Sequence, residues 1–331
     1  MIKVSIVVPV FNINKKLLTK CITSLMNQTL DSIEIILVDD ASSLTETIEI
    51  LNDFKSKYSD IITVVTHKTN KKQGGARNSG MKVAKGQFIG FVDADDYIDK
   101  NMYKLLYEKA IDDKADIVDC DLIHVDTNDK VMKREISLSK FTELDLIQYA
   151  GRIVTKIFKL RMLQDNKIYF PENMFYEDNA IYGIYNLYAN KISKINKYLY
   201  YYVRHQNSTL ANSKLHIDDK VNAGIIYYDI YKKRGFLEKY QYEVQMQFVN
   251  IYFILTYRLI SKYDNDYINK LNNMIEVIKN KDIDILKVIK HSKLSIKRKL
   301  EVLLLIKVPI LYKWYVNLRY RKYKINVSHN E

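Results

Sequence analysis

The chain has 331 residues, 47% of them hydrophobic, with only 9 glycines and 3 prolines, which excludes a largely disordered chain, a collagen-like chain and a loop-rich β-sandwich. The net charge of +13 is consistent with binding to nucleic acid or to an anionic membrane, or with a genome that favours lysine codons. The two cysteines, Cys21 and Cys120, lie far apart, which suggests neither a disulfide framework nor a zinc knuckle and fits a reducing cytoplasm.

The first 113 residues alternate strand-like and helix-like segments. Short apolar runs predict strands over 4–10, 33–38, 61–65 and 88–92, with helical patterns between them, the last one over 76–85 after a polar stretch. Continuous apolar strands joined by helices predict an α/β fold with a mostly parallel sheet flanked by helices. Ligands of such sheets bind outside the carboxyl ends of the strands.

The pattern changes further along the chain. Shorter strand candidates follow at 117–125, 130–136 and 198–203, and a helix is expected to begin near Glu177. From about His216 the apolar residues recur with a period near 3.6, which predicts helices only. We therefore expect a catalytic domain over 1–213, with halves of about 1–113 and 114–213, and an all-helical C-terminal extension over 214–331.

Carboxylates follow two of the predicted strands. Asp93, Asp95 and Asp96 crowd one strand end, where they repel each other unless a cation or hydroxyl groups neutralise them. Mg²⁺ and Mn²⁺ prefer such oxygen ligands and bridge them to substrate phosphates. Asp39 and Asp40 end another strand and are placed to accept hydrogen bonds from a ring N–H or a ribose hydroxyl. The alternative for both groups is a solvated turn that caps the next helix.

Two further segments carry groups suited to phosphates. Gly74–Gly80 is a glycine-rich stretch that allows close approach of the backbone to a diphosphate, while Arg77 supplies a guanidinium fork. Arg204 and His205 follow the last strand candidate and are suited to phosphate, metal or acceptor contacts. An ordinary solvent-exposed loop is the alternative for the segment with Arg204 and His205, and a glycine-rich turn by itself is a weak signal for a phosphate site.

Glu177 and Asp178 lie where an aromatic stretch meets a helical run. Carboxylates beside aromatic side chains can have a raised pKa, which suits a general base near neutral pH. The alternative needs no function, because acidic residues in the first turn of a helix are stabilised by the helix dipole.

Four segments in their order and spacing resemble the successive signatures of family 2 glycosyltransferases: Val4–Asn12, Ile35–Ser42, Gly74–Gly80 and Phe91–Asp96. The resemblance covers about residues 1–110 and extends to Glu177, Asp178 and the segment from Arg204. It implies the Rossmann-like GT-A fold, an inverting transfer from a nucleoside-diphosphate sugar, with UDP the expected nucleotide, and Mn²⁺ or Mg²⁺ at the leaving diphosphate.

The resemblance also implies roles for single residues. Asp95 becomes the principal metal ligand, with Asp93 at the ribose or assisting the metal, and Asp96 able to exchange roles with Asp95. Asp178 becomes the base, with Glu177 as its acceptor-binding neighbour or as the base itself. The expected donor-binding residues are Pro9, Phe11, Asp39, Asp40, Arg77, Asp93, Ala94, Asp95, Arg204 and His205.

The C-terminal segment holds most of the excess positive charge. Between Lys297 and Lys324 there are nine lysines and arginines and one glutamate. After Pro309, an apolar helical face with Leu311, Trp314, Tyr315 and Leu318 opposes a basic one with Lys313, Asn317, Arg321 and Lys324. This pattern predicts contact with an anionic membrane rather than nucleic acid, and the alternative is a helix packed on its own domain.

These features predict a cytoplasmic enzyme, peripheral at the inner face of the plasma membrane, acting on a glycan or polyprenyl-linked acceptor of a bacterial surface polysaccharide, teichoic acid or capsule. The N-terminus shows no signal-peptide pattern, no apolar run reaches the roughly 20 residues that span a bilayer, and the Gln-x-x-Arg-Trp signature of processive synthases is missing. A nucleotidyltransferase, a haloacid-type phosphatase and an inactive membrane-associated scaffold are the rival hypotheses. The loop after the first strand argues against the first, and Asp95 followed by Asp96 argues against the second.

Overall fold

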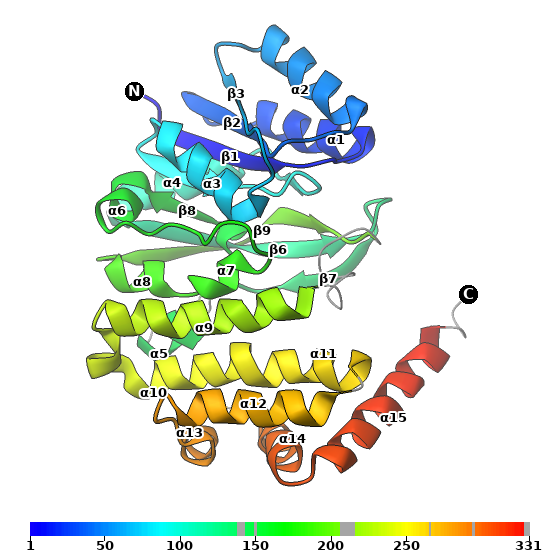
Figure 1. Ribbon diagram of the computed structural model, residues 1–331. Helices are drawn as coiled ribbons and strands as arrows, with labels where there is room; N and C mark the ends of the chain where they lie inside the picture. Colours follow the sequence, from blue (N-terminus) through cyan, green and yellow to red (C-terminus); the bar gives the residue numbers. More distant parts are fainter. Residues whose placement is uncertain (138–142, 149–150, 206–215, 265, 293–294, 328–331) are drawn as a thin grey trace. The chain divides into compact units, whose positions relative to one another are not determined.

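The computed structural model describes residues 1–137, 143–148, 151–205, 216–264, 266–292 and 295–327. The chain divides into two compact units, Met1–Ala211 and Asn212–Glu331. The first combines a sheet with helices, and the described part of the second consists of helices (Figure 1). The predicted boundary near residue 213 lies outside the described residues.

The first half of Met1–Ala211 is parallel, as predicted. Its strands are β1 (Val4–Val10), β2 (Ile33–Asp39), β3 (Ile62–Thr66) and β4 (Phe88–Phe91). β1 pairs in parallel with β2 and β4, and β2 with β3. Every residue of β1 is buried, as expected for a strand covered on both faces. The helices here are α1 (Lys15–Met26), α2 (Thr45–Lys57), α3 (Lys72–Val83) and α4 (Met102–Asp113).

The second half makes the sheet mixed. The strand order over the described residues is β3-β2-β1-β4-β8-β6-β9-β5, with β7 paired to β6. β8 runs antiparallel to both β4 and β6, whereas β9 is parallel to β6. The strands are β5 (Tyr97–Ile98), β6 (Ile117–Val125), β7 (Val131–Glu135), β8 (Lys156–Lys159) and β9 (Ile192–Val203). The short helices are α5 (Glu143–Gln148), η1 (Ile153–Thr155), α6 (Leu160–Asp165), α7 (Glu177–Ala180) and α8 (Ile184–Tyr188).

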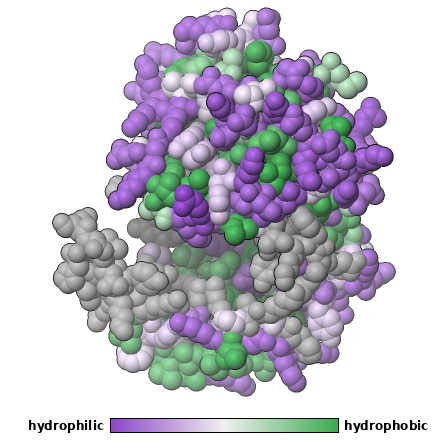
Figure 2. All heavy atoms as spheres, turned by 180° about the vertical axis from the view of Figure 1, so that it is seen from behind, coloured by the Kyte–Doolittle hydropathy of each residue, from purple (hydrophilic) through white to green (hydrophobic). Residues whose placement is uncertain are grey.

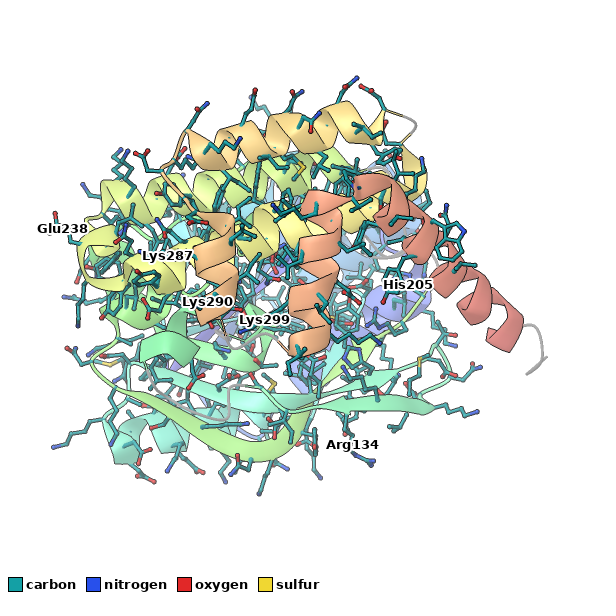
Figure 3. All side chains as sticks on the ribbon, turned by 90° about the horizontal axis from the view of Figure 1, so that it is seen from below. Arg134, His205, Glu238, Lys287, Lys290 and Lys299 are labelled. Carbon is teal, nitrogen blue, oxygen red and sulfur yellow. The ribbon has the colours of Figure 1, made fainter. Side chains whose placement is uncertain are left out.

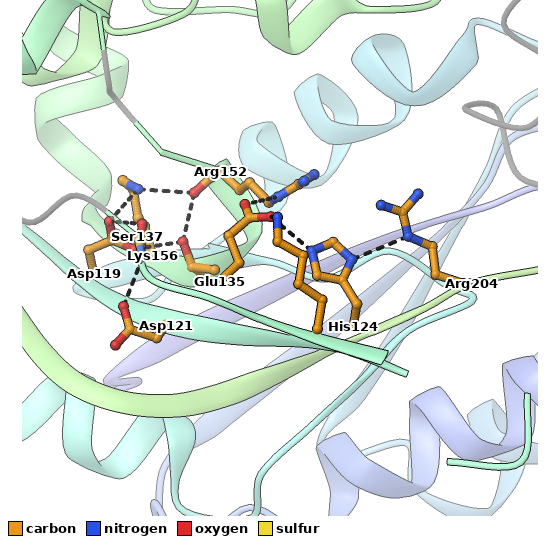
Figure 4. Close-up of polar contacts among 10 residues, drawn as sticks. Asp119, Asp121, His124, Glu135, Ser137, Arg152, Lys156 and Arg204 are labelled. Atoms are coloured by element: carbon orange, nitrogen blue, oxygen red, sulfur yellow. Dashed lines mark hydrogen bonds and ion pairs between the residues drawn. The ribbon is translucent and has the colours of Figure 1, made fainter. Parts of the chain in front are cut away.

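A buried ion pair joins the two antiparallel strands at the centre of this half. Lys156 of β8 and Asp119 of β6 are cross-strand partners, both fully buried, with Nζ 2.7 Å from Oδ2 (Figure 4). The Thr155 hydroxyl donates to the other oxygen of Asp119 at 2.6 Å. Because a buried charge without its partner is costly, this pair fixes β8 against β6.

The glycine-rich segment is helical, and its helix starts earlier than predicted. α3 begins at Lys72 rather than near Ala76. A Cβ on Gly80 would lie 2.3 Å from Val7 of β1, and one on Gly74 would lie 2.0 Å from the Pro171 carbonyl oxygen. These glycines therefore allow a helix to pack closely on a strand and a loop.

The helical unit is confirmed by the structure. Its helices are α9 (Ile217–Lys233), α10 (Phe236–Phe248), the π-helix η3 (Val249–Ile254), α11 (Leu255–Tyr263), α12 (Tyr267–Lys279), α13 (Ile285–His291), α14 (Ile296–Lys307) and α15 (Pro309–Val327). Tyrosines fill much of its core, with Tyr227, Tyr231 and Tyr257 fully buried. Within the described residues, no helix is both long and apolar enough to cross a bilayer.

Candidate active site

A cavity of about 470 Å³ opens at the carboxyl ends of β1, β2 and β4, where the parallel topology predicts a ligand site. Loops after these strands and the start of α3 supply its walls. Phe11 is 44% exposed at its edge. Of the residues expected to bind the donor, those that line the cavity are Pro9, Phe11, Asp40, Ala94, Asp95 and His205.

The two aspartates after β2 have different surroundings. Asp39 accepts a hydrogen bond from the Ser42 backbone at 2.9 Å, in the turn before α2, and does not line the cavity. Oδ1 of Asp40 accepts from His67 Nδ1 at 2.7 Å and from the Lys71 backbone at 2.8 Å. Oδ2 of Asp40 is buried and has no partner among the described residues. Of the two aspartates, Asp40 is therefore the one at the cavity wall, and the role of Asp39 in binding the donor stays a prediction.

The carboxylates after β4 also differ. Asp96 is 2% exposed, and its oxygens accept from the Tyr200 hydroxyl at 2.6 Å and the Val203 backbone at 2.7 Å. Asp95 lines the cavity, with Oδ2 2.7 Å from Nε2 of His205. Of the two aspartates predicted to exchange roles at a metal, Asp95 lines the cavity and Asp96 does not, so metal binding by Asp96 stays a prediction.

The carboxylates of Asp93, Asp95 and Asp96 repel each other. Burial first, and then the charges of Asp95 and Asp93, raise the pKa of Asp96 well above its ordinary value. Burial likewise raises the pKa of Asp93, although Arg77 opposes the shift. The hydrogen bond to Asp95 raises the pKa of His205, so a positive charge is already favoured at that carboxylate. Hard carboxylate oxygens in this field suit Mg²⁺ or Mn²⁺.

Arg77 lies in the interior, not in the cavity. Its side chain is 3% exposed; NH1 pairs with Glu177 Oε1, and NH2 lies 2.8 Å from Asp93 Oδ1. Arg77 therefore ties the end of β4 to the start of α7. Carboxylates of the protein contact both terminal nitrogens, and a contact of Arg77 with the donor nucleotide stays a prediction.

Glu177 and Asp178 point to different environments. Glu177 is 3% exposed, and its burial raises its pKa to about 7 against the charge of Arg77. Asp178 is exposed, and Oδ1 accepts only from the Asn179 backbone, at 2.9 Å, among the described residues. Of the two candidate bases, Asp178 is the one a substrate can reach.

Several residues of the cavity wall were not predicted. Asn12 has a φ of 48°, and its side-chain oxygen accepts from Ser43 and Leu44 at 2.8 and 2.9 Å, so it ties the loop after β1 to the start of α2. Asparagine tolerates positive φ, which is a signal that the sequence offered. Lys72 lies 4.8 Å from the Phe175 ring centre, a contact no local pattern announces.

The sequence profile described as glycosyl transferase family 2 matches residues 5–181. The chain belongs to this glycosyltransferase family. Apart from His205, the residues that line the cavity lie within the matched range, as do Asp95 and the exposed Asp178. Arg204 and His205 follow it, and Arg204 does not line the cavity. Both cysteines are free and buried.

Two relatives are poly(ribitol-phosphate) transferases. A beta-glucosyltransferase of Bacillus spizizenii is 33% identical over 210 residues, covering 61% of this chain and 32% of the relative. The beta-N-acetylglucosaminyltransferase TarS of Staphylococcus aureus is 27% identical over 327 residues, covering 88% of this chain and 56% of the relative. The chain thus spans about a third to a half of the length of these relatives.

Solved structures confirm the GT-A fold expected for the family. Residues 1–349 of S. aureus TarS, in complex with UDP-GlcNAc, match with a TM-score of 0.56 at 23% identity, covering 85% of this chain and 92% of that chain. A mannosyltransferase of Pyrobaculum calidifontis in complex with GDP-Man and Mn²⁺ matches with a TM-score of 0.53 at 13% identity, covering 96% and 84%.

Proposed function

We propose that this protein is an inverting glycosyltransferase that moves a sugar from a UDP-sugar to a hydroxyl of a glycan or lipid-linked acceptor in bacterial surface polysaccharide synthesis, of the teichoic acid type. The observation that carries the proposal is the arrangement of the cavity. Asp40 and Asp95 both line this cavity, and Asp178 is exposed on α7. Family membership and the relatives' names support the substrate class.

The cavity residues account for donor binding. The carboxylate of Asp40, at the cavity wall, would accept a ring N–H of the nucleotide base, and the exposed Phe11 offers a flat apolar contact. Asp95, assisted by His205, would hold Mn²⁺ or Mg²⁺. When bound, the cation neutralises the negative charge of the leaving diphosphate. Among the described residues, no group of three or more acidic, histidine or cysteine side chains is preassembled around such an ion.

Asp178 accounts for activation of the acceptor. An inverting displacement needs a base that removes the hydroxyl proton as the oxygen attacks the anomeric carbon. The exposed carboxylate of Asp178 is available for that proton. The Arg77–Glu177 ion pair holds the first turn of α7, which carries Asp178, in place against β4.

A direct test measures UDP release from UDP-glucose and UDP-GlcNAc with and without Mn²⁺, and follows the anomeric proton of the product by NMR. We expect metal-stimulated release and a product with inverted configuration. Asp95→Asn is expected to abolish metal stimulation. An inactive scaffold would bind no UDP-sugar and release no UDP under any of these conditions.

We also propose that α14 and α15 rest on an anionic membrane at the inner face of the plasma membrane. Apolar side chains that remain exposed on this pair and its connection are Ile296, Leu300, Leu303, Val308, Ile310, Leu311, Trp314 and Leu318. Figure 2 shows apolar residues gathered on the helical unit, at the bottom of the view. Lys297 and Lys307 are exposed beside them, and Lys299 lies next to Lys290 of α13 (Figure 3). Such a face suits the headgroup region.

Two residues of the predicted amphipathic pattern have partners within the protein. The Tyr315 hydroxyl donates to Glu301 at 2.9 Å, and Lys313 Nζ lies 4.0 Å from the Tyr267 ring centre. The side chains of Arg321 and Lys324 lie outside the described residues. The proposed membrane contact therefore depends on the aliphatic residues and Trp314, with basic groups from α14.

Trp314 is the only tryptophan, so its fluorescence reports this contact directly. We expect a blue shift with phosphatidylglycerol vesicles and little shift with phosphatidylcholine. The double variant Leu300→Ser/Ile310→Ser should lose the shift, whereas Met132→Ser, which removes an apolar side chain 62% exposed on β7, should keep it. An unshifted spectrum of the unaltered protein with anionic vesicles would rule the contact out.

A further inference from the structure

Two arginines lie around one aromatic ring beside the candidate active site. The guanidinium carbons of Arg152 and Arg204 are 5.2 and 5.0 Å from the ring centre of Tyr202. Arg152 lies just before β8, and Arg204 directly follows β9, so the sheet brings them together from positions 52 residues apart. Both groups are cationic and contact the same ring, which makes the pair a candidate anion site.

Both side chains are held by their Nε groups. Arg152 Nε donates to Glu135 Oε1 at 3.0 Å, and Arg204 Nε donates to His124 Nδ1 at 3.2 Å. Nε2 of His124 lies 2.8 Å from the other oxygen of Glu135 (Figure 4). Since Nδ1 accepts from Arg204, His124 is neutral, and its Nε2–H donates to Glu135.

The side chains in this chain of contacts carry a net positive charge. Glu135 is the one carboxylate in the chain of contacts, while Arg152, Arg204 and Lys133, whose Nζ is 3.4 Å from Glu135, are all cationic. In the part of the chain that the structure describes, the NH1 and NH2 groups of Arg152 and Arg204 have no acceptor. A guanidinium fixed through Nε with a free terminal fork suits a phosphate oxygen pair.

One arginine of the pair adjoins the candidate active site. Arg204 precedes His205, whose Nε2 lies 2.7 Å from Asp95 Oδ2. The same two arginines do not line the cavity that holds the proposed donor site. An anion bound by them would therefore lie apart from the pocket for the base of the nucleotide.

We propose that Arg152 and Arg204 bind a phosphate group of the acceptor and so present its hydroxyl to Asp178. The inference rests on the proposed transferase activity and narrows its substrate class to phosphate-bearing acceptors. Tyr202 supplies the ring on which both guanidinium groups pack, and His124 and Glu135 are positioning residues. The other source of the same chemistry, the diphosphate of the donor, is distinguished by the test below.

The test compares kinetics of the full chain with a poly(ribitol phosphate) acceptor, using Arg152→Gln, Arg204→Gln and the double variant. Each single variant is expected to raise the acceptor KM about ten- to a hundredfold, as for loss of a charged hydrogen bond. The donor KM and acceptor-independent UDP release should change less than threefold. Inorganic phosphate should compete with the acceptor in the unaltered protein, and this competition should weaken in the double variant.

The matched control is Arg134→Gln. Arg134 is exposed on β7 and points away from the ribbon in Figure 3. Arg134→Gln removes one positive charge, as each single test variant does, and should leave both KM values unchanged. A raised donor KM with an unchanged acceptor KM would assign the arginines to the donor diphosphate and overturn the proposal, as would unchanged values for both. If the unaltered protein releases no UDP, the failure belongs to the proposed transferase activity instead.

Discussion

The two halves of the sheet in Met1–Ala211 gather charged groups of opposite sign. One half gathers them in the loops after its strands, and the other gathers them around a side chain of a strand. On the parallel side, carboxylates gather in the loops after β2 and β4, where Asp40 and Asp95 face the cavity. On the mixed side, guanidinium groups gather around Tyr202 on β9, held by His124 of β6 and Glu135 of β7. The acidic side suits a cation with a nucleotide diphosphate, and the basic side suits an anionic acceptor.

The difference shows how each kind of sheet assembles a site. Parallel strands end at one edge, so short motifs placed after successive strands meet there without further specification. In the mixed half, neighbours come from strands of either direction, and side chains meet only through the register of their pairing. Each of the following variants weakens one side and is expected to leave the other intact.

Asp178→Asn is expected to have the largest effect. Loss of the base should lower kcat for transfer by about 10²- to 10⁴-fold. UDP binding, measured by calorimetry, should remain within a factor of two, because Asp178 does not line the cavity. Asp112→Asn, which alters an exposed aspartate on α4, is the control. Equal loss in both variants, or weakened UDP binding, would contradict the separation of the two sides.

Lys156→Met tests the framework of the mixed half. The variant leaves Asp119 buried without its cation, which should lower the free energy of unfolding by about 3–5 kcal/mol. Lys159→Met removes a neighbouring lysine whose side chain is 50% exposed, and should cost less than about 1 kcal/mol. Urea unfolding monitored by circular dichroism measures both. Similar losses would mean that the buried pair has no special role.

Asp40→Asn and Asp39→Asn discriminate the two aspartates after β2. Removing the charge of Asp40, which lines the cavity, should raise the donor KM roughly tenfold, in line with a lost hydrogen bond to a charged group. Asp39→Asn should change the donor KM less than threefold, since Asp39 contacts the Ser42 backbone. A larger rise of the donor KM in Asp39→Asn than in Asp40→Asn would instead assign Asp39 to the base of the donor nucleotide.

We expect a fall in pH to weaken the contacts that hold Arg204 through His124. Burial, followed by the charge of Arg204 against the pull of Glu135, lowers the pKa of His124 below its ordinary value of about 6.5. The unfolded chain therefore binds more protons than the folded one below pH 6.5, and the stability that depends on neutral His124 is lost as pH falls from there toward the folded pKa.

Protonation of His124 also removes the acceptor for Arg204 Nε. Between pH 7.5 and 5.5 we expect the acceptor KM to rise severalfold more than the donor KM. In His124→Gln this additional rise should be absent. Parallel changes of the two KM values in the unaltered protein would show that His124 does not couple to acceptor binding.

The sequence by itself determined the parallel strands, the helical C-terminal unit and the strand ends that surround the cavity. This was possible because apolar periodicity specifies which residues are buried, and parallel strands place their carboxyl ends together. Asp95, Phe11 and His205 were found in this way or through the family signatures. Beyond β4, periodicity did not reveal that β8 runs antiparallel between β4 and β6.

Tertiary structure alone decided which polar side chains face the cavity and which form hydrogen bonds or ion pairs with one another. Arg77 pairs with Glu177 a hundred positions away, Asp96 is bonded to Tyr200, and Arg152 is anchored by Glu135. No local pattern encodes these contacts, because the partners are selected by strand register and packing. A charged side chain moved from water into the interior must find a partner there, and the folded chain offers only the one that its topology brings near.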